Sequence, residues 1–216
     1  MDMEDPAMSM PPFHMVRVEG DWAHKDGVDL ASWEVEASIG RDVNKFVLKS
    51  EGEVSDGVTH EAEVWGLYNR EIAEFWDLQA GLRQDFAPVD TTFAVIGVEG
   101  LAPQFIETAA YAFVSHRGDV GARIEQSIDL PVTQRLIATP HLKADFWARD
   151  VPEYDAGAGL AMIETGLQLR YEITRKFAPY VDLNYQRGIG ETAGRLRASG
   201  EDAGELTFRI GLRIWI

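Results

Sequence analysis

The 216-residue sequence predicts an all-β fold, an antiparallel transmembrane β-barrel of about 12 strands with short periplasmic turns and longer extracellular loops. Three observations lead to this prediction. Apolar and polar residues alternate along many segments, so that each segment has two sets of alternate residues, which we call its phases. Charged residues are nearly absent from one phase, and aromatic residues gather near segment ends. A period of two is typical of a β-strand, and a strand that spans a bilayer needs only about 9 to 11 residues with one apolar face.

The final segment shows the alternation most clearly. Every even-numbered residue from Leu206 to Ile216 is apolar, whereas the odd-numbered residues between them include Arg209, Gly211 and Arg213. Runs of this kind predict about twelve strands, near residues 14–23, 30–39, 44–53, 58–70, 75–86, 91–101, 105–115, 119–130, 134–148, 158–173, 178–189 and 205–216. A closed bacterial barrel requires an even number of strands.

The connections between these strands are of two kinds. Short ones with apolar residues and proline, at 72–75, 101–105, 130–133 and 176–180, alternate with polar ones rich in glycine and aspartate, at 25–27, 55–57, 117–119, 150–157 and 190–204. Tight turns at one rim and longer loops at the other are typical of outer-membrane barrels. The aromatic residues at strand ends predict girdles at the two bilayer interfaces; they are Trp33, Phe46, Tyr68, Trp76, Phe86, Phe105, Phe146, Tyr171 and Tyr180.

A soluble β-sandwich or lipocalin-like barrel is the alternative fold, because its strands also alternate. The polar outer face of such a protein would carry charges anywhere, whereas here one phase carries almost none. The membrane barrel is therefore favoured. No stretch approaches the roughly 20 apolar residues of a membrane helix. Barrel strands give a weak hydropathy signal, which agrees with a mean hydropathy of -0.18.

Composition excludes several classes of function. The chain has 20 lysine and arginine residues against 36 aspartate and glutamate residues, a formal net charge of -16. Such a surface repels nucleic-acid phosphates, so we expect no nucleic-acid partner. The absence of cysteine excludes a disulfide framework, an iron–sulfur cluster and a thiol nucleophile. Any metal must therefore be bound by nitrogen, oxygen or thioether ligands.

Several segments resemble the copper-resistance protein B (CopB/PcoB) family. They include Phe75-Trp76-Asp77-Leu78-Gln79-Ala80-Gly81 and Leu130-Pro131-Val132-Thr133-Gln134-Arg135-Leu136, together with residues 39–45, 48–53, 100–103, 170–173 and 177–181. The resemblance covers about residues 32 to 216. It implies a barrel in the outer membrane of a Gram-negative bacterium, in contact with outer-membrane lipid and exported by a signal peptide that is not part of this sequence.

The same resemblance implies a function. We expect a copper-resistance protein, not an enzyme, that binds copper ions or moves them across the outer membrane, with a periplasmic multicopper oxidase as a partner. The alternative is a general small-solute or cation pore, or a structural barrel without a specific role in copper handling.

The N-terminus carries soft metal ligands. Residues 1–13 are predicted to be a flexible, methionine-rich arm, and residues 14–216 the barrel. Thioethers favour Cu(I), and imidazole accepts both oxidation states. Together with the resemblance, this makes the arm a candidate for copper capture, through Met3, Met8, Met10, His14 and Met15. An ordinary disordered terminus is the alternative. Family members commonly carry a longer segment rich in methionine and histidine.

Other candidate ligands lie in the barrel. His141 shares its phase with Thr139, Lys143 and Asp145, so it is predicted to face the lumen, as a metal ligand or as a hydrogen-bonded wall residue. Three further histidines lie near the loop rim and form an outer site only if barrel closure joins their loops; they are His24, His60 and His116.

Carboxylates outnumber basic groups on the lumen phase. The predicted acidic path comprises Glu34, Glu36, Glu51, Glu63, Asp77, Asp145 and Glu164. One interpretation is a set of cross-strand ion pairs, such as Lys143 with Glu164 and Asp182 with Arg213, that makes the barrel rigid. The other is a path that attracts cations such as copper. An outer-membrane hydrolase would need a Ser/His pair, for which Ser50 and His60 are the candidates.

Overall fold

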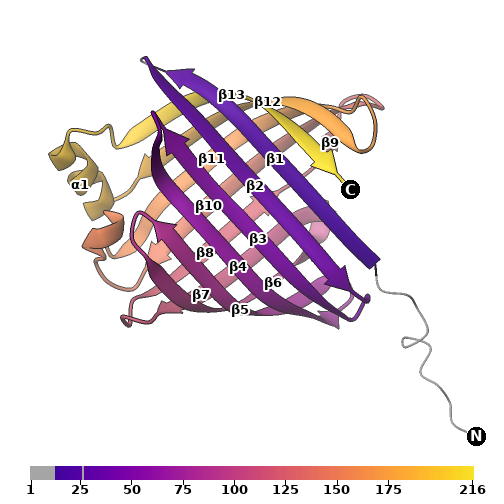
Figure 1. The fold of residues 1–216 in the computed structure, drawn as a ribbon, viewed down its shortest axis with the longest axis horizontal. Helices are drawn as coiled ribbons and strands as arrows, with labels where there is room; N and C mark the ends of the chain where they lie inside the picture. The colour runs from indigo at the N-terminus through magenta and orange to yellow at the C-terminus, as the bar shows by residue number, and fades with distance from the viewer. Residues whose placement is uncertain (1–12, 26) are drawn as a thin grey trace, which may run out of the picture.

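The computed structural model describes residues 13–25 and 27–216, which form a closed antiparallel β-barrel (Figure 1). The strands are β1 (Phe13–Lys25), β2 (Val28–Gly40), β3 (Asn44–Ser55), β4 (Val58–Ala73), β5 (Trp76–Ala87), β6 (Thr91–Ala102), β7 (Ile106–Ser115), β8 (Val120–Ser127), β9 (Leu130–Pro131), β10 (Leu136–Trp147), β11 (Gly159–Tyr171), β12 (Phe177–Gly188) and β13 (Gly204–Trp215). Because β9 has only two residues and pairs with β10, the wall consists of twelve long strands. The predicted fold class is confirmed.

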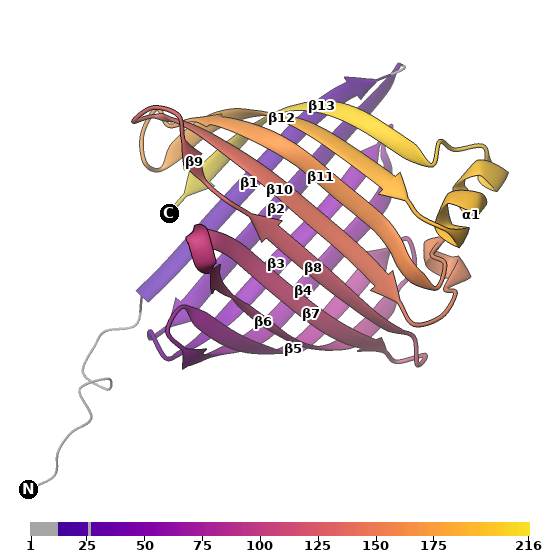
Figure 2. The same cartoon turned by 180° about the vertical axis from the view of Figure 1, so that it is seen from behind.

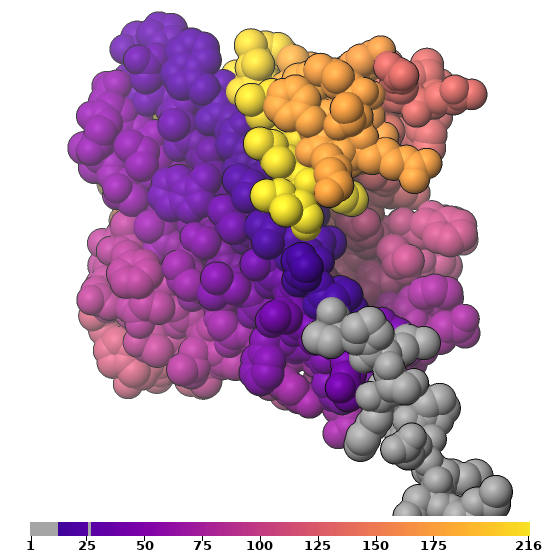
Figure 3. Space-filling view, turned by 45° about the vertical axis from the view of Figure 1, so that its right-hand side comes forward, coloured from indigo at the N-terminus to yellow at the C-terminus, as the bar shows by residue number. Residues whose placement is uncertain are grey.

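The barrel closes between its first and last strands. β1 pairs with β13 from Arg17 opposite Trp215 to Trp22 opposite Ile210. Two backbone hydrogen bonds between Val16 and Ile216, of 3.1 and 2.9 Å, extend this ladder. Figure 3 shows the end of β13 lying against β1. Closure of this kind satisfies backbone N–H and C=O groups without water, as a bilayer demands.

Both ends of the described chain lie at one rim, which we call the terminal rim. The connections there are residues 41–43, 74–75, 103–105, 128–135 and 172–176. At the opposite rim, only residues 148–158 and 189–203 form long connections, so the prediction of longer loops holds for these two alone. β3 and β4, for example, are joined by Asp56 and Gly57, whose φ values of 48° and 79° fit a two-residue hairpin turn.

The outer face carries the apolar phase of each strand. Leu82, Ile96 and Phe208 are 58%, 55% and 56% exposed, as expected for side chains that contact lipid. Of the predicted girdle residues, Phe46 and Tyr68 also point outward and pack edge to face. Tyr180 was wrongly assigned to a girdle: it is buried in the lumen, where its hydroxyl donates to Asp21 over 3.0 Å.

One element was not predicted. α1 (Glu191–Ser199) forms within the segment 190–204 that was expected to be a loop, and it ends at Gly200, whose φ of 90° suits a helix C-cap. Glu191 in the first turn and Arg197 in the last turn match the helix dipole. Thr192 holds α1 against the preceding long loop by accepting a 2.9 Å hydrogen bond from the Gly157 N–H. None of the helices in the described part of the chain is long and apolar enough to span a membrane.

A charge on the outer face should prevent assembly. Changing Ile210 or Leu212 to Arg should disfavour insertion by about 2 to 4 kcal/mol each at mid-bilayer, because the guanidinium would face hydrocarbon. Urea titration of refolding into lipid vesicles measures this cost. Glu201→Arg, at an exposed site after α1, is the matched control and should have little effect. Equal stability of all three variants would contradict the assignment of the outer phase to lipid.

Candidate functional site

Aromatic side chains fill one side of the barrel interior. This aromatic cluster comprises Trp65 on β4, Phe93 on β6, Phe113 on β7, Trp147 on β10 and Tyr154 in the connection that follows β10. Phe93 and Phe113, and Phe113 and Trp147, pack edge to face with ring centroids 5.5 Å apart. The cluster was not predicted. Its sequence signal is that β6 and β7 are apolar on both phases, whereas other strands are apolar on one.

The connection 148–158 folds inward over the aromatic cluster. Val151 and Ala156 are buried there, and the Tyr154 hydroxyl donates to Asp85 over 2.9 Å. Arg149 anchors the connection to the β7–β8 turn through a 2.6 Å ion pair with Asp119. The hydrogen bond from Arg149 holds the pKa of Asp119 below its ordinary value, so the carboxylate keeps its charge to a lower pH than an unpaired aspartate would.

A buried charge network lies beside the aromatic cluster. Arg123 contacts Glu51, Glu63 and Asp145 at 2.5, 2.8 and 2.8 Å. Arg83 contacts Glu63 and Asp85, both at 2.5 Å. The Arg83 guanidinium also lies 5.2 Å from the Trp65 and Phe93 ring centroids, so the network and the cluster are one packed unit.

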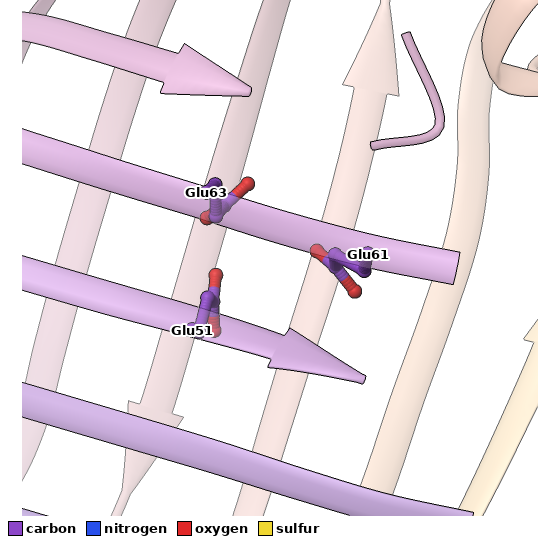
Figure 4. Close-up of side chains that lie close together, drawn as sticks. All are labelled: Glu51, Glu61 and Glu63. Atoms are coloured by element: carbon purple, nitrogen blue, oxygen red, sulfur yellow. The ribbon is translucent and has the colours of Figure 1, made fainter. Parts of the chain in front are cut away.

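Three glutamates of this region lie close together. Figure 4 shows Glu51 on β3 facing Glu63 on β4, with Glu61 nearer the start of β4. Their carboxylate oxygens lie within 4.8 Å of one another. Arg123 bridges Glu51 and Glu63, and Lys143 binds Glu51 at 3.1 Å. Because cations already neutralise these oxygens, and oxygen is not the ligand that copper prefers, we assign the cluster to structure.

Further ion pairs follow the strands on the other side of the lumen. Arg17 binds Glu34 and Glu36 at 2.7 and 3.0 Å, and Arg213 binds Glu19 at 2.7 Å. Arg209 binds Glu53 at 3.0 Å and Lys49 binds Glu99 at 2.6 Å.

All seven residues of the predicted acidic path face the lumen. Glu34, Glu36, Glu51, Glu63, Asp77 and Asp145 are in ion pairs, with Lys45 as the partner of Asp77 at 2.8 Å. Glu164 instead accepts a 2.5 Å hydrogen bond from Asn184. Neither of the suggested ion pairs forms: Lys143 reaches across to Glu51, and Arg213 binds Glu19.

A cavity of about 460 Å³ runs along the side of the lumen that the aromatic cluster leaves open. Its lining extends from Glu107 and Asp129, near the terminal rim, to Glu61 and Gln186, toward the opposite rim. Carboxylates dominate this lining. Thirteen of them line it, namely Glu19, Asp21, Glu34, Glu36, Glu51, Glu53, Glu61, Glu99, Glu107, Glu125, Asp129, Glu164 and Asp182, against the five bases Arg17, Lys49, Lys143, Arg209 and Arg213.

His141 lines the same cavity, on the predicted face. Its ring lies over Gly166 on β11, where a Cβ atom would come within 2.6 Å of Cε1 and Nε2. Nδ1 lies 4.0 Å from Oδ1 of Asp182, which is too far for a hydrogen bond. Asp182 is only 6% exposed, and among the described residues Oδ1 has no hydrogen-bond partner. The cavity wall thus holds an imidazole next to an unsatisfied carboxylate oxygen.

The predicted arm lies mostly beyond the region that the structure describes. Met3, Met8 and Met10 fall outside the described residues. His14 and Met15 are already part of β1, where consecutive side chains point to opposite faces. In this strand His14 takes the outer phase and Met15 the lumen phase. The two therefore cannot bind one ion as an adjacent pair while β1 keeps this conformation.

The remaining candidates are not brought together. His24, His60 and His116 lie at β1, β4 and just after β7, so successive members are three strands, or about 14 Å, apart. His24 is paired with Asp29 at 2.7 Å. Ser50 lies opposite Val64, four residues from His60, and its Oγ accepts a 3.2 Å hydrogen bond from Trp33. Ser50 and His60 are therefore not a nucleophile and base.

Comparison with known proteins identifies the family. Residues 14–216 match the family described as "Copper resistance protein B precursor (CopB)". The chain belongs to this family. A copper resistance protein B homolog of Pseudomonas syringae pv. tomato is 38% identical to it over 196 residues, which cover 90% of this chain and 67% of the relative. Copper resistance protein B of Escherichia coli is also 38% identical over 196 residues, covering 90% and 66%. The chain thus spans about two thirds of the length of these relatives.

Solved outer-membrane porins share the fold. The NanC porin superposes with a TM-score of 0.63 at 14% identity, covering 92% of this chain and 98% of that one. The KdgM porin superposes with a TM-score of 0.58 at 12% identity and the same coverage. With the family match, these neighbours indicate an outer-membrane barrel of the copper-resistance protein B family.

Loss of the Arg123 guanidinium, which joins three carboxylates, should destabilise the barrel. Arg123→Met leaves Glu51, Glu63 and Asp145 without their shared partner, which should lower the free energy of unfolding by about 3 to 5 kcal/mol. Urea unfolding in detergent micelles measures the change. Arg175→Met, in an exposed turn, is the control and should stay within about 0.5 kcal/mol of the parent. Equal stabilities would show that the network contributes nothing to the fold.

Proposed function

We propose that this chain binds copper ions and conducts them along the acidic cavity of an outer-membrane barrel. The observation that carries the proposal is the lining of the cavity, with thirteen carboxylates, five lysine or arginine side chains and the imidazole of His141. The ion is cargo in this proposal, and the protein performs no covalent chemistry on it.

The excess of carboxylates attracts cations into the cavity. Ion pairs neutralise only part of the acidic lining, and low-dielectric walls focus the field of the remainder into the cavity. Such a field raises the local concentration of cations and repels anions. The field alone does not distinguish copper from other cations, because carboxylates are also good ligands for Mg²⁺ and Ca²⁺.

His141 supplies preference for a transition metal. Imidazole nitrogen suits copper, and the Asp182 oxygen at 4.0 Å supplies a second donor at a spacing that one bound ion can bridge with metal–ligand bonds of about 2 Å. A site with two protein donors in a water-accessible cavity binds weakly enough to release its ion. This suits transfer better than storage.

The N-terminal arm would capture copper at the mouth of the barrel at the terminal rim. We assign residues 1–13 to a methionine-rich arm and residues 14–216 to the barrel, with Phe13 at the junction, where β1 begins. β1 begins at the terminal rim, so thioethers from Met3, Met8 and Met10 would act at that mouth, together with Met15 on the lumen phase. Short turns at this rim support a periplasmic orientation, with export by a signal peptide. A periplasmic multicopper oxidase would then exchange copper at the same rim.

A non-selective cation pore is the second candidate. The porin neighbours and the scarcity of soft ligands among the described lining residues favour it. Both candidates predict cation attraction, so only copper-specific measurements separate them.

Copper binding should depend on two separable sites. Removal of residues 1–12 should lower the Cu(I) stoichiometry while leaving the barrel intact, and His141→Ala should lower Cu(II) affinity about tenfold by removing the cavity nitrogen. His60→Ala, an exposed histidine of the opposite rim, is the control. Metal titration of the full chain in detergent measures both effects. If neither variant differs from the parent, the described ligands do not bind copper.

Cells should show the same dependence. A deletion strain should grow poorly on copper, and the wild-type chain should restore growth while a Glu34→Gln/Glu36→Gln variant restores it only partly, because the field at the cavity weakens. Glu201→Gln/Asp202→Asn removes the same charge from an exposed loop and should restore growth fully. If growth of the deletion strain does not depend on copper but changes with the supply of small solutes, the result would favour the pore.

A further inference from the structure

The seam between β1 and β13 closes along only part of its length. Its ladder ends at Trp22 opposite Ile210. Within the described residues, the rest of β1 pairs only with β2, and residues 204–209 pair only with β12. Figures 1 and 2 both show the end of β1 standing apart from the start of β13. A free strand edge presents unpaired N–H and C=O groups, which membrane barrels normally avoid in contact with hydrocarbon.

A groove of about 320 Å³ lies at this gap on the outer surface. Trp22 and His24 line it from β1, and Leu206, Phe208 and Ile210 line it from β13. These five side chains belong to the phase that contacts lipid, and Trp22 and Phe208 are 49% and 56% exposed. Four of the five are apolar, so the groove is largely apolar and open to the bilayer.

Charged side chains lie at the end of the groove toward the opposite rim. Lys25 lies there on β1, where its ammonium pairs with Glu205 at 3.0 Å. Arg187 on β12 is exposed and lies opposite Gly204, at the start of β13. Glu205 neutralises Lys25, which takes the lumen phase of β1, whereas Arg187 takes the outer phase of β12 and has no ion-pair partner among the described residues. A largely apolar slot that ends beside this guanidinium can receive an anionic amphiphile.

We propose that this groove binds one acyl chain of a phosphate-bearing bilayer lipid. The groove opens on the outer phase, which faces the bilayer, and an acyl chain matches its apolar walls. The phosphate would contact Arg187, beside the ion-paired Lys25, and the lipid oxygens would accept hydrogen bonds from the free strand edge. The bound lipid thus completes a seam that the protein leaves open. This inference is independent of the proposed copper function.

Lipid retention tests the assignment. The full chain is reconstituted in phosphatidylcholine vesicles with diphosphoryl lipid A, extracted in mild detergent and analysed by native mass spectrometry. The wild type should retain one lipid A, and Lys25→Gln/Arg187→Gln should lower its occupancy at least fivefold. The control Arg175→Gln/Lys176→Gln removes the same charge at the terminal rim and should leave occupancy unchanged. Equal occupancy in the two double variants would overturn the proposal.

Disulfide formation provides an independent measurement, because the chain has no native cysteine. His24→Cys/Phe208→Cys would face each other if the ladder continued, whereas Val18→Cys/Ile214→Cys lies in the closed part of the seam. With lipid A present, the first pair should oxidise at least tenfold more slowly than the second. Equal rates would show a closed seam, and covalent dimers would show that a second copy occupies the groove; either result contradicts lipid binding.

Discussion

Closure of a β-ladder in a bilayer constrains every other feature of this structure. Where the ladder is closed it satisfies the backbone, and it leaves each strand with one face toward hydrocarbon. Charged side chains must then share the other face, inside a narrow interior where an unpaired charge is costly. The ion pairs of Arg17, Arg83, Arg123, Arg209 and Arg213 are the result. These ion pairs offset part of the negative charge that the lumen carboxylates place inside the barrel of a chain with a net charge of -16.

The barrel interior has one tightly packed side and one polar side that contains the cavity. The aromatic cluster and the Arg83–Arg123 network occupy one side, and the connection 148–158 covers them at the opposite rim. The 460 Å³ cavity occupies the other side, where the carboxylates exceed the bases. The packed side fixes the positions of the strands that carry the cavity. A rigid barrel can thereby hold an acidic path whose excess of charge would otherwise oppose folding.

Much of the fold could be predicted from the sequence, because a period of two fixes both the strand and its face. The segment from Leu206 to Ile214 shows this well, because each even-numbered residue that was assigned to lipid points outward in β13. The alternation did not predict α1, because apolar and polar residues do not alternate in its segment. It also misplaced Tyr180, since an aromatic near a strand end fits a girdle and a lumen equally well.

The contacts across the lumen could not be predicted. Lys143 lies opposite Glu164 in the ladder yet reaches Glu51 on β3, which is 92 residues away in the chain. Such pairs depend on barrel closure and tilt, which no local pattern encodes. His141 could be assigned to the lumen from its phase, whereas its proximity to Asp182 could not. The function of either residue in copper binding stays a prediction.

Attraction of cations along one acidic side of the lumen is what the proposed function depends on. The most direct measurement is the reversal potential of the full chain in a planar bilayer under a tenfold gradient of potassium chloride. An acidic lumen should give a potential of the sign that cation preference produces, and this preference should weaken at high salt as the Debye length falls from about 10 Å at 0.1 M to about 3 Å at 1 M. A potential of the opposite sign, showing anion preference, would contradict it.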